Sequence, residues 1–456
     1  MLHFSDTVAA VSTPRGKGGI AVIRISGPET GALLHKVFRG KLDPVAHPRH
    51  ACFGVILDPD GTELDEGLVL YFPAPHSFTG EDVAEISCHG GALLTETVLA
   101  AVLSAGARAA EAGEFTRRAL LNGKMTLSSA EALGALLEAQ TTGQMTLARG
   151  GMTGRLSAAV GETFDRLSLL LADAYAKIDF PDEDLNTLGR GEFTAALAEV
   201  RERIAALLST YRTGHAVAEG IATVICGPVN AGKSTLYNAL VGREAAIVTD
   251  VAGTTRDVLC ETVALGAVTL RLYDTAGLRE TEDTVEGIGI QRARRTMEEA
   301  ELILAVLDAS VPLGEEQRAL LADLRGLSAT KVIVLNKCDN GVCFAADSLA
   351  DFKHVVALSA KNGDVSALRA VVEELYLSDG LSLREDAVVA NARQYAALKR
   401  AEEALGIAIH SLDADVPLDA ACIDAEMALQ ALSEVDGRMV DEAIISSIFS
   451  HFCVGK

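Results

Sequence analysis

The chain has 456 residues and a formal net charge of −23 at pH 7, from 40 Lys and Arg against 63 Asp and Glu. The length predicts two or three domains. A protein that grips a nucleic-acid backbone unaided usually carries a basic face. If RNA is a substrate, a basic partner or a small local basic patch must therefore help to hold it.

Hydrophobic residues make up 49% of the chain, but aromatic residues only 4%, and Trp is absent. Burial by alanine and leucine favours helices. The sequence has no unbroken apolar run of membrane-spanning length and no basic segment before an apolar one, so we expect neither a membrane span nor a signal peptide. The eight cysteines include no C-x-x-C pair, which predicts reduced thiols and a cytoplasmic location.

Residues 1–121 have the pattern of an α+β domain. Strand-like runs at 6–11, 19–25, 68–72 and 82–87 precede a helix predicted over about 92–104. Two of these runs carry a charged residue, Arg24 and Glu85. Strict alternation makes an outward-facing charge on a half-exposed sheet the commoner interpretation, and a binding site is the alternative.

Residues 122–216 change to long helical patterns. Ser128-x-x-Glu131 predicts a capping box at a helix start. Apolar periodicity then predicts helices over 156–178 and 192–208.

A phosphate-binding loop follows. Residues 227–234 read GPVNAGKS and fit G-x-x-x-x-G-K-S/T, between an apolar strand at 221–226 and a helix beginning near Thr235. Backbone N–H groups and the helix N-terminus suit phosphate oxygens. Lys233 can reach the β- and γ-phosphates, and the Ser234 hydroxyl suits Mg²⁺.

Three further strand ends predict that the nucleotide is GTP. The strand ending at Tyr273 leads into Asp274-Thr275-Ala276-Gly277, where a carboxylate can hold Mg²⁺ through water and a glycine N–H can sense the γ-phosphate. The strand at 332–335 leads into Asn336-Lys337-Cys338-Asp339, and a carboxylate there can accept two hydrogen bonds from guanine but not from adenine. Ser359-Ala360-Lys361 follows a strand at 354–358. Together these four segments predict a GTPase.

The glutamine that orients water in many GTPases is replaced here by Leu278. Either the protein hydrolyses GTP poorly, or a nearby acid substitutes: Glu280, Glu282, Asp283 or Glu286. In residues 249–257 a threonine can complete the Mg²⁺ shell. Backbone carbonyls there, with a carbonyl oxygen of Asn230, can hold a monovalent cation where other systems place an arginine finger.

Beyond residue 379 the pattern is helical again, most clearly over 392–410 and 420–432. We therefore expect a multidomain α/β and α protein. The predicted parts are an α+β domain (1–121), a helical domain in two pieces (122–216 and 379–456), and an inserted phosphate-loop, Ras-like GTPase domain with a mostly parallel sheet (217–378).

The chain resembles the MnmE (TrmE) family of bacterial tRNA-modification GTPases over nearly its whole length. The similarity lies in the segments TPRGKGGI (13–20), SFTGED (77–82), GEFT (113–116), NAGKS (230–234), AGTTRD (252–257), DTAGLR (274–279) and the final FCVGK (452–456). A thiol and a lysine at the end of a chain contribute little to a core but can form a site.

This resemblance implies a K⁺-dependent GTPase that dimerises through its GTPase domains and, constitutively, through an N-terminal domain that binds a formyl-tetrahydrofolate one-carbon donor. With an FAD-binding partner of the MnmG type, the family adds an aminomethyl or carboxymethylaminomethyl group to carbon 5 of the wobble uridine of certain tRNAs. The implied folate-binding residues are Arg24, Glu85, Lys124 and Lys456; the implied K⁺ ligands are Asn230, Thr249, Val251 and Thr254; Ser234 and Thr255 would bind Mg²⁺; and Glu286 and Cys453 would be catalytic. The full predicted GTP-binding set is Asn230, Ala231, Gly232, Lys233, Ser234, Thr235, Thr249, Asp250, Val251, Ala252, Gly253, Thr254, Thr255, Asp274, Thr275, Ala276, Gly277, Asn336, Lys337, Asp339, Ser359, Ala360 and Lys361.

Two other functions stay open at this point. A GTP-switch assembly factor, for example for ribosomes, would need no folate site, and the tail from Cys453 to Lys456 argues against it. A folate-dependent one-carbon enzyme regulated by GTP would not need the complete set of GTPase segments.

Overall fold

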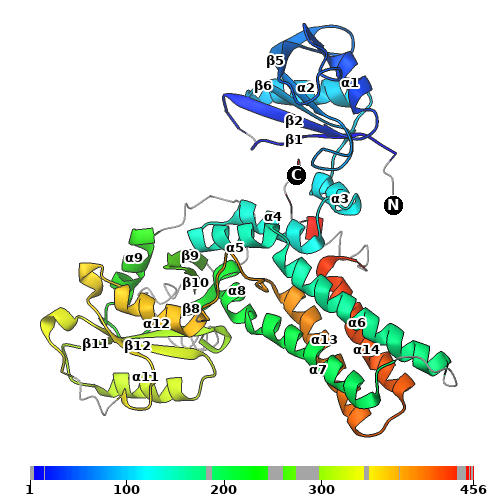
Figure 1. The fold of residues 1–456 in the computed structure, drawn as a ribbon. Helices are drawn as coiled ribbons and strands as arrows, with labels where there is room; N and C mark the ends of the chain where they lie inside the picture. The colour runs from blue at the N-terminus through cyan, green and yellow to red at the C-terminus, as the bar shows by residue number, and fades with distance from the viewer. Residues whose placement is uncertain are drawn as a thin grey trace, which may run out of the picture. The chain divides into compact units, whose positions relative to one another are not determined.

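The computed structural model describes residues 5–14, 16–180, 187–244, 260–273, 297–343, 349–378, 380–438, 448–450, 452 and 455. The chain divides into two compact units (Figure 1). The first unit combines Met1–Gly134 with Asp436–Lys456, and the second is Ala135–Val435.

The first unit is built on a seven-stranded sheet of order β3-β4-β5-β6-β2-β1-β7. Neighbouring strands are antiparallel except β1 and β7, which are parallel. One face of the sheet packs against α1 and α2 around a core that includes Ile23, Val69 and Ile86. The bounds are β1 Val8–Val11, β2 Ile20–Ser26, α1 Thr30–Val37, β3 Phe38–Gly40, β4 Cys52–Leu57, β5 Glu63–Phe72, β6 Val83–His89, α2 Ala92–Ser104 and β7 Arg108–Ala109.

Helices α3 (Glu114–Leu121) and α4 (Leu127–Glu138) follow. The predicted capping box at Ser128 and Glu131 is wrong, because α4 has already begun at Leu127 and Ser128 is buried within its first turn. Thr126 does the capping instead: its Oγ1 accepts a hydrogen bond from the Ser129 amide at 3.2 Å. The two positions differ by two residues, and either could satisfy a free N–H group at a helix start.

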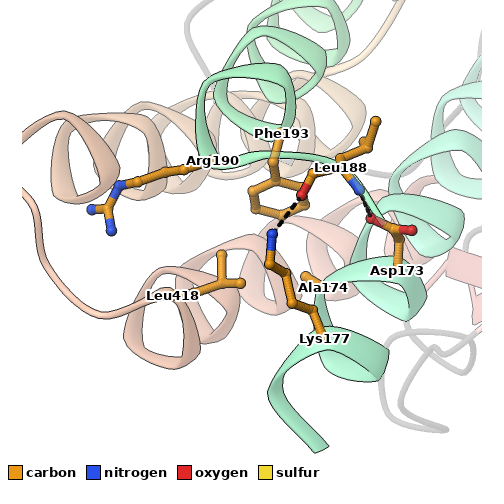
Figure 2. A pocket seen from close by; sticks show the side chains of 7 residues that line it. All are labelled: Asp173, Ala174, Lys177, Leu188, Arg190, Phe193 and Leu418. Atoms are coloured by element: carbon orange, nitrogen blue, oxygen red, sulfur yellow. Dashed lines mark hydrogen bonds between the residues drawn. The ribbon is translucent and has the colours of Figure 1, made fainter. Parts of the chain in front are cut away.

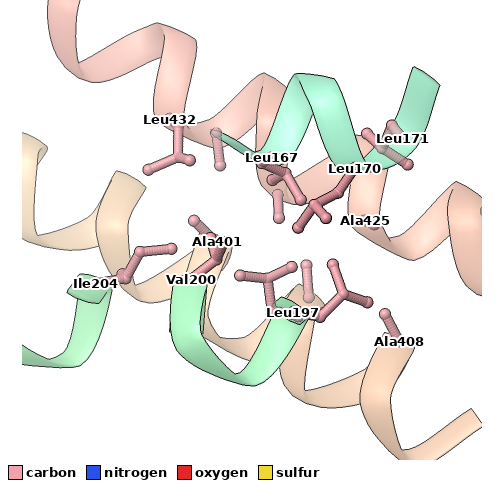
Figure 3. Packing of buried hydrophobic residues seen from close by; sticks show 14 of the residues in the cluster. Leu167, Leu170, Leu171, Leu197, Val200, Ile204, Ala401, Ala408, Ala425 and Leu432 are labelled. Carbon is pink, nitrogen blue, oxygen red and sulfur yellow. The ribbon is translucent and has the colours of Figure 1, made fainter. Parts of the chain in front are cut away.

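The helices of the second unit include a bundle formed by α6, α7, α13 and α14 (Figure 3). Leucines such as Leu167, Leu197 and Leu432 interdigitate with alanines such as Ala401 and Ala425, and all five are at most 1% exposed. Small side chains let the helix axes approach closely, which explains how a chain poor in aromatic residues builds this core. The bounds are α5 Thr142–Met152, α6 Arg155–Asp179, α7 Arg190–Ser209, α8 Tyr211–Ala218, α13 Ala392–Asp413 and α14 Leu418–Asp436.

The second unit also holds a six-stranded sheet of order β13-β12-β11-β8-β10-β9, in which only the β9–β10 pair is antiparallel. Helices α9 and α12 cover one face and α11 the other (Figure 1). This is the mostly parallel α/β sheet that the sequence predicts, with ligand sites expected at the carboxyl ends of its strands. The bounds are β8 Ile221–Cys226, α9 Lys233–Glu244, β9 Cys260–Leu265, β10 Val268–Tyr273, β11 Leu302–Asp308, α11 Glu315–Arg325, β12 Thr330–Asn336, β13 Val355–Ala357 and α12 Ser366–Tyr376. Among the described residues, no helix is long and apolar enough to cross a membrane.

Candidate functional site

The phosphate loop connects β8 to α9, as its sequence predicts. Gly232 has a φ of +96°, and a Cβ there would collide with the Asn336 amide nitrogen. Lys233 Nζ donates to the carbonyl oxygens of Gly227 at 2.9 Å and Pro228 at 2.8 Å. Burial lowers the pKa of Lys233. Within the described part of the chain, neutral carbonyl oxygens accept the hydrogen bonds of this ammonium, so it is well placed to bind a phosphate instead.

Asn336 joins three of the predicted segments. Its side chain is buried at the end of β12, where Nδ2 donates to the Ala231 carbonyl oxygen at 2.9 Å. Its Oδ1 accepts from the Ala360 amide, also at 2.9 Å. The structure thus brings the phosphate loop, the 336–339 segment and the 359–361 segment together at one edge of the sheet.

Lys337 adds a second link to the phosphate loop. Its Nζ donates to the Asn230 carbonyl oxygen at 2.7 Å and lies 2.6 Å from Asp308 Oδ2. Sequence reasoning missed Asp308. The signal was present, because residues 302–307 form a buried apolar run that leads into a polar residue, as the run before Asn336 in β12 does.

The side chains expected to read guanine lie close to this network. Asp339 lies in the exposed 3-10 turn η2 (Cys338–Asn340), and Lys361 in η4 (Ala360–Asn362) is also exposed. Ser359 is 8% exposed, and its buried Oγ has no hydrogen-bond partner among the described residues. A buried hydroxyl left without a partner is unfavourable, so a polar ligand at this edge fits the residues present.

Many of the predicted site residues lie outside the described residues. They are Thr249, Asp250, Val251, Ala252, Gly253, Thr254, Thr255, Asp274, Thr275, Ala276, Gly277, Glu286, Cys453 and Lys456. Ser234 and Thr235 are described, and both are exposed at the N-terminus of α9.

In the first unit, Arg24 and Glu85 pair with each other across β2 and β6. Arg24 Nη2 lies 2.8 Å from Glu85 Oε1, and the two side chains keep 22% and 29% of their surface exposed. The Arg24 guanidinium also lies 5.5 Å from the centre of the Phe78 ring. Phe78, which is 37% exposed, was not predicted as a site residue.

Lys124 contacts the same loop. Its Nζ donates to the Pro75 carbonyl oxygen at 2.9 Å, and its stem lies 3.3 Å from where a Cβ on Gly80 would be. The loop over residues 75–80 therefore contacts Lys124, and through Phe78 it contacts Arg24.

The end of the chain packs against this unit as well. The Gly455 carbonyl oxygen accepts from Ser12 Oγ at 2.9 Å, and with a φ of +96° a Cβ on Gly455 would collide with the Val11 carbonyl oxygen. Phe449 is 2% exposed, and its ring centre lies 5.2 Å from that of Phe452. Gly455 is thus held beside the end of β1, next to the strand that carries Arg24.

The helical bundle contains a cavity of about 190 Å³ (Figure 2). Its polar lining groups already have partners: Asp173 accepts from the Leu188 amide, Lys177 donates to the Leu188 carbonyl, and Arg190 donates to the carbonyl of Leu412. The cavity offers a ligand mainly the apolar surface of Phe193 and Leu418, so we do not treat it as the functional site.

Comparisons with known proteins match nearly the whole chain. The family model described as the GTP-binding protein TrmE N-terminus matches residues 7–124, and the MnmE helical domain matches residues 127–453. The tRNA modification GTPase MnmE of Heliobacterium modesticaldum is 41% identical over 99% of both chains. That of Bacillus subtilis is 40% identical over 99% of this chain and 100% of its own length.

Among solved structures, the G domain of the T. maritima FeoB iron transporter matches 34% of this chain and 94% of its own. The two are 23% identical, with a TM-score of 0.25. A TM-score at this level carries no argument. Full-length identity near 40% does, and the chain belongs to the MnmE (TrmE) family of tRNA modification GTPases.

Proposed function

We propose that this protein is a GTP-hydrolysing tRNA-modification enzyme. With an FAD-dependent partner of the MnmG type, it would install an aminomethyl or carboxymethylaminomethyl group at carbon 5 of the wobble uridine of certain tRNAs. The single observation that carries the GTP part is the position of Asn336, which ties the phosphate loop to the two segments expected to read guanine.

In this proposal, Asp339 accepts hydrogen bonds from guanine, and Lys233 binds the phosphates. Mg²⁺, held by Ser234 and Thr255, would neutralise charge on the phosphate oxygens. Hydrolysis would depend on Glu286 to orient the attacking water, because Leu278 cannot do so.

K⁺ would be held by Asn230, Thr249, Val251 and Thr254, and would supply positive charge beside the phosphates. The Asn230 carbonyl already accepts a hydrogen bond from the Lys337 ammonium. A second cation at that oxygen would be repelled, so we assign the side-chain amide oxygen of Asn230 to the ion.

The folate site would be formed by Arg24, Glu85, Lys124 and Lys456. The Glu85 carboxylate can accept from N–H groups of a pterin ring, and the cations suit the glutamate tail of formyl-tetrahydrofolate. The Gly455 carbonyl oxygen accepts a hydrogen bond from Ser12, just beyond the end of the strand next to β2, and this supports a proposed role there for Lys456 and for Cys453 as the catalytic thiol. A GTP-switch assembly factor would not need this arrangement.

We further propose a homodimer through the N-terminal sheet. Its open face carries Phe53, Leu68 and Ile20, which are 60%, 40% and 69% exposed. Phe53 and Leu68 lie opposite each other on neighbouring strands, so they form a continuous apolar patch of the kind that protein interfaces bury. The domain limits 1–121, 122–216, 217–378 and 379–456, and a cytoplasmic location, remain part of this proposal.

Two binding measurements test the two sites separately. Titration with GTP and ATP should show binding of GTP alone, and loss of GTP binding in Lys233→Ala with the fold retained. Titration with 5-formyltetrahydrofolate should show binding that Arg24→Ala abolishes and Lys233→Ala leaves intact. Equal affinity for ATP and GTP would refute the guanine assignment, and folate binding unchanged in Arg24→Ala would refute the folate site.

A further inference from the structure

Asp308 stands at the carboxyl end of β11, the strand that lies between β8 and β12 in the sheet. In the register of β11 and β12, Asp308 pairs with Asn336, so its carboxylate is next to the residue that ties the nucleotide segments together. Among the described residues, the Asp308 side chain makes no hydrogen bond to the phosphate loop or to the 359–361 segment. Whatever it does for the nucleotide must pass through a neighbour.

That neighbour is Lys337. Asp308 Oδ2 lies 2.6 Å from Lys337 Nζ, and the same Nζ donates to the Asn230 carbonyl oxygen at 2.7 Å. The other carboxylate oxygen, Oδ1, accepts from the Ser310 amide at 3.0 Å and from Ser310 Oγ at 2.6 Å. The carboxylate is therefore fixed on one side by Ser310 and fixes the ammonium on the other.

The electrostatic setting makes this pair stronger than a surface ion pair. The side chain of Asp308 is 16% exposed and that of Lys337 34% exposed. Burial alone would raise the pKa of Asp308, but the hydrogen bonds from Lys337 and Ser310 hold it below its usual value. Asp308 is therefore charged at neutral pH, and its hydrogen bond to the ammonium is charge-assisted.

The two ends of the Lys337 bond are both strained. Lys337 has a φ of +63° and Asn230 a φ of +62°, and they are two of four non-glycine residues with positive φ in the described part of the chain. Such conformations persist only where surrounding contacts hold them. The hydrogen bond from Lys337 to Asn230 joins these two strained residues, and Asp308 holds the donor in place.

We propose that Asp308 is a positioning residue for the nucleotide, which holds the Lys337 ammonium against the Asn230 carbonyl and so sets the shape of the phosphate loop. The proposal rests on the GTP site described above and deepens it. Without the carboxylate, the four-carbon stem of Lys337 is free to turn into solvent, and the loop loses the bond that holds Asn230.

The expected signature is a loss of nucleotide affinity with little loss of turnover. The loop contacts ground state and transition state alike, so Asp308→Asn should raise the KM for GTP and leave kcat nearly unchanged. The affinities for GTP and GDP should both fall, by roughly 10- to 100-fold, the scale of one charge-assisted hydrogen bond. Ser310→Ala keeps the carboxylate but removes one of its two anchors, so it should give a smaller loss in the same direction.

A double-mutant cycle separates positioning from a general structural role. Lys337→Met removes the ammonium and keeps the stem. If Asp308 acts through Lys337, the double variant Asp308→Asn/Lys337→Met should bind GTP as Lys337→Met alone does. Asp351→Asn is the matched control: it removes one carboxylate from an exposed ion pair with Arg325 on the same sheet domain and should bind GTP normally.

The outcomes are distinct. The positioning role is overturned if the losses of GTP affinity multiply in the double variant, or if Asp308→Asn binds GTP as tightly as the wild-type protein does. In either case the GTP site itself stands, provided that the wild-type protein binds GTP. Failure of the wild-type protein to bind GTP would overturn the proposed function and this inference with it. If Asp308→Asn does not fold, as judged by its thermal unfolding, Ser310→Ala decides: unchanged GTP affinity in that variant contradicts the proposal.

Discussion

Asn336 and Ala231 lie 105 residues apart in the chain and are joined by a buried hydrogen bond of 2.9 Å from Asn336 Nδ2 to the Ala231 carbonyl oxygen. The same side chain accepts from the Ala360 amide. One buried amide group therefore sets the spacing between the loop expected to bind phosphate and the segments expected to bind the base.

Asn336→Ala should weaken both binding and stability. It leaves the Ala231 carbonyl and the Ala360 amide buried without partners, at about 1–3 kcal/mol for each group. We expect a clear drop in the melting temperature and a fall in GTP affinity of at least about tenfold, measured by thermal unfolding and calorimetric titration. Asn238→Ala, at an exposed position on α9, is the control. Normal GTP affinity in Asn336→Ala would show that the hydrogen bonds of Asn336 to Ala231 and Ala360 have no part in GTP binding.

Asp339→Asn should change which base is bound. Asparagine offers one acceptor and one donor where guanine presents only donors, so GTP affinity should fall by roughly one to three orders of magnitude. Xanthine presents one donor and one acceptor on the same edge, and XTP should therefore bind the variant better than the wild type. Competition titrations with both nucleotides measure this, and unchanged GTP affinity would remove Asp339 from the site.

His215 should make stability depend on pH. On α8, its Nδ1 lies 3.4 Å from Glu219 Oε2 and its Nε2 3.5 Å from Glu301 Oε2, with Arg271 3.8 Å from Glu301. The neighbouring carboxylates of Glu219 and Glu301 raise the pKa of His215 to about 9.

Because this pKa is above the value of about 6.5 in an unfolded chain, the folded state binds the proton more tightly. The stabilisation is fully present below about pH 6.5 and is lost as the pH rises through about 9. The melting temperature of the wild type should fall toward that of His215→Gln over this range, whereas the exposed His410→Gln should follow the wild type at every pH. A constant difference between wild type and His215→Gln would contradict the assignment.

Gly455→Ala should separate GTP hydrolysis from tRNA modification. A Cβ at this position collides with the Val11 carbonyl and strains a backbone with φ of +96°, so the tail should leave the end of β1. GTP hydrolysis, which resides in the other unit, should be unchanged while tRNA modification is lost. Parallel loss of GTP hydrolysis would mean that the tail serves the fold as a whole.

The sequence predicted four of the six strands of the α/β sheet, β8, β10, β12 and β13, because each is a short apolar run followed by a recognisable segment. The strands β8, β10 and β12 and the long helices α6, α7 and α13 all lie where periodicity places them. The sequence predicted the N-terminal cap of α4 poorly. Thr126 and Ser128 carry equivalent hydroxyls, and only the packing of α4 decides which of them caps the helix.

Contacts between distant segments were beyond sequence reasoning. The strand pattern alone made an outward-facing charge the commoner interpretation of Arg24 and Glu85, and only the register of β2 and β6 shows that they pair with each other. Asp308 was missed because nothing in the strand itself marks its last residue as functional. Its role depends on a hydrogen bond from Lys337, which is 29 residues away in the chain. The roles of Glu286, Cys453 and Lys456 remain predictions, because these residues lie outside the described part of the chain.

We propose that this GTPase modifies tRNA at the wobble uridine. The most direct measurement is mass spectrometry of tRNA nucleosides from a strain that lacks the gene, complemented with the wild type or with Lys233→Ala. We expect uridines substituted at carbon 5 to disappear on deletion, to return with the wild type and not to return with Lys233→Ala. Unchanged levels of these nucleosides in the deletion strain would contradict it.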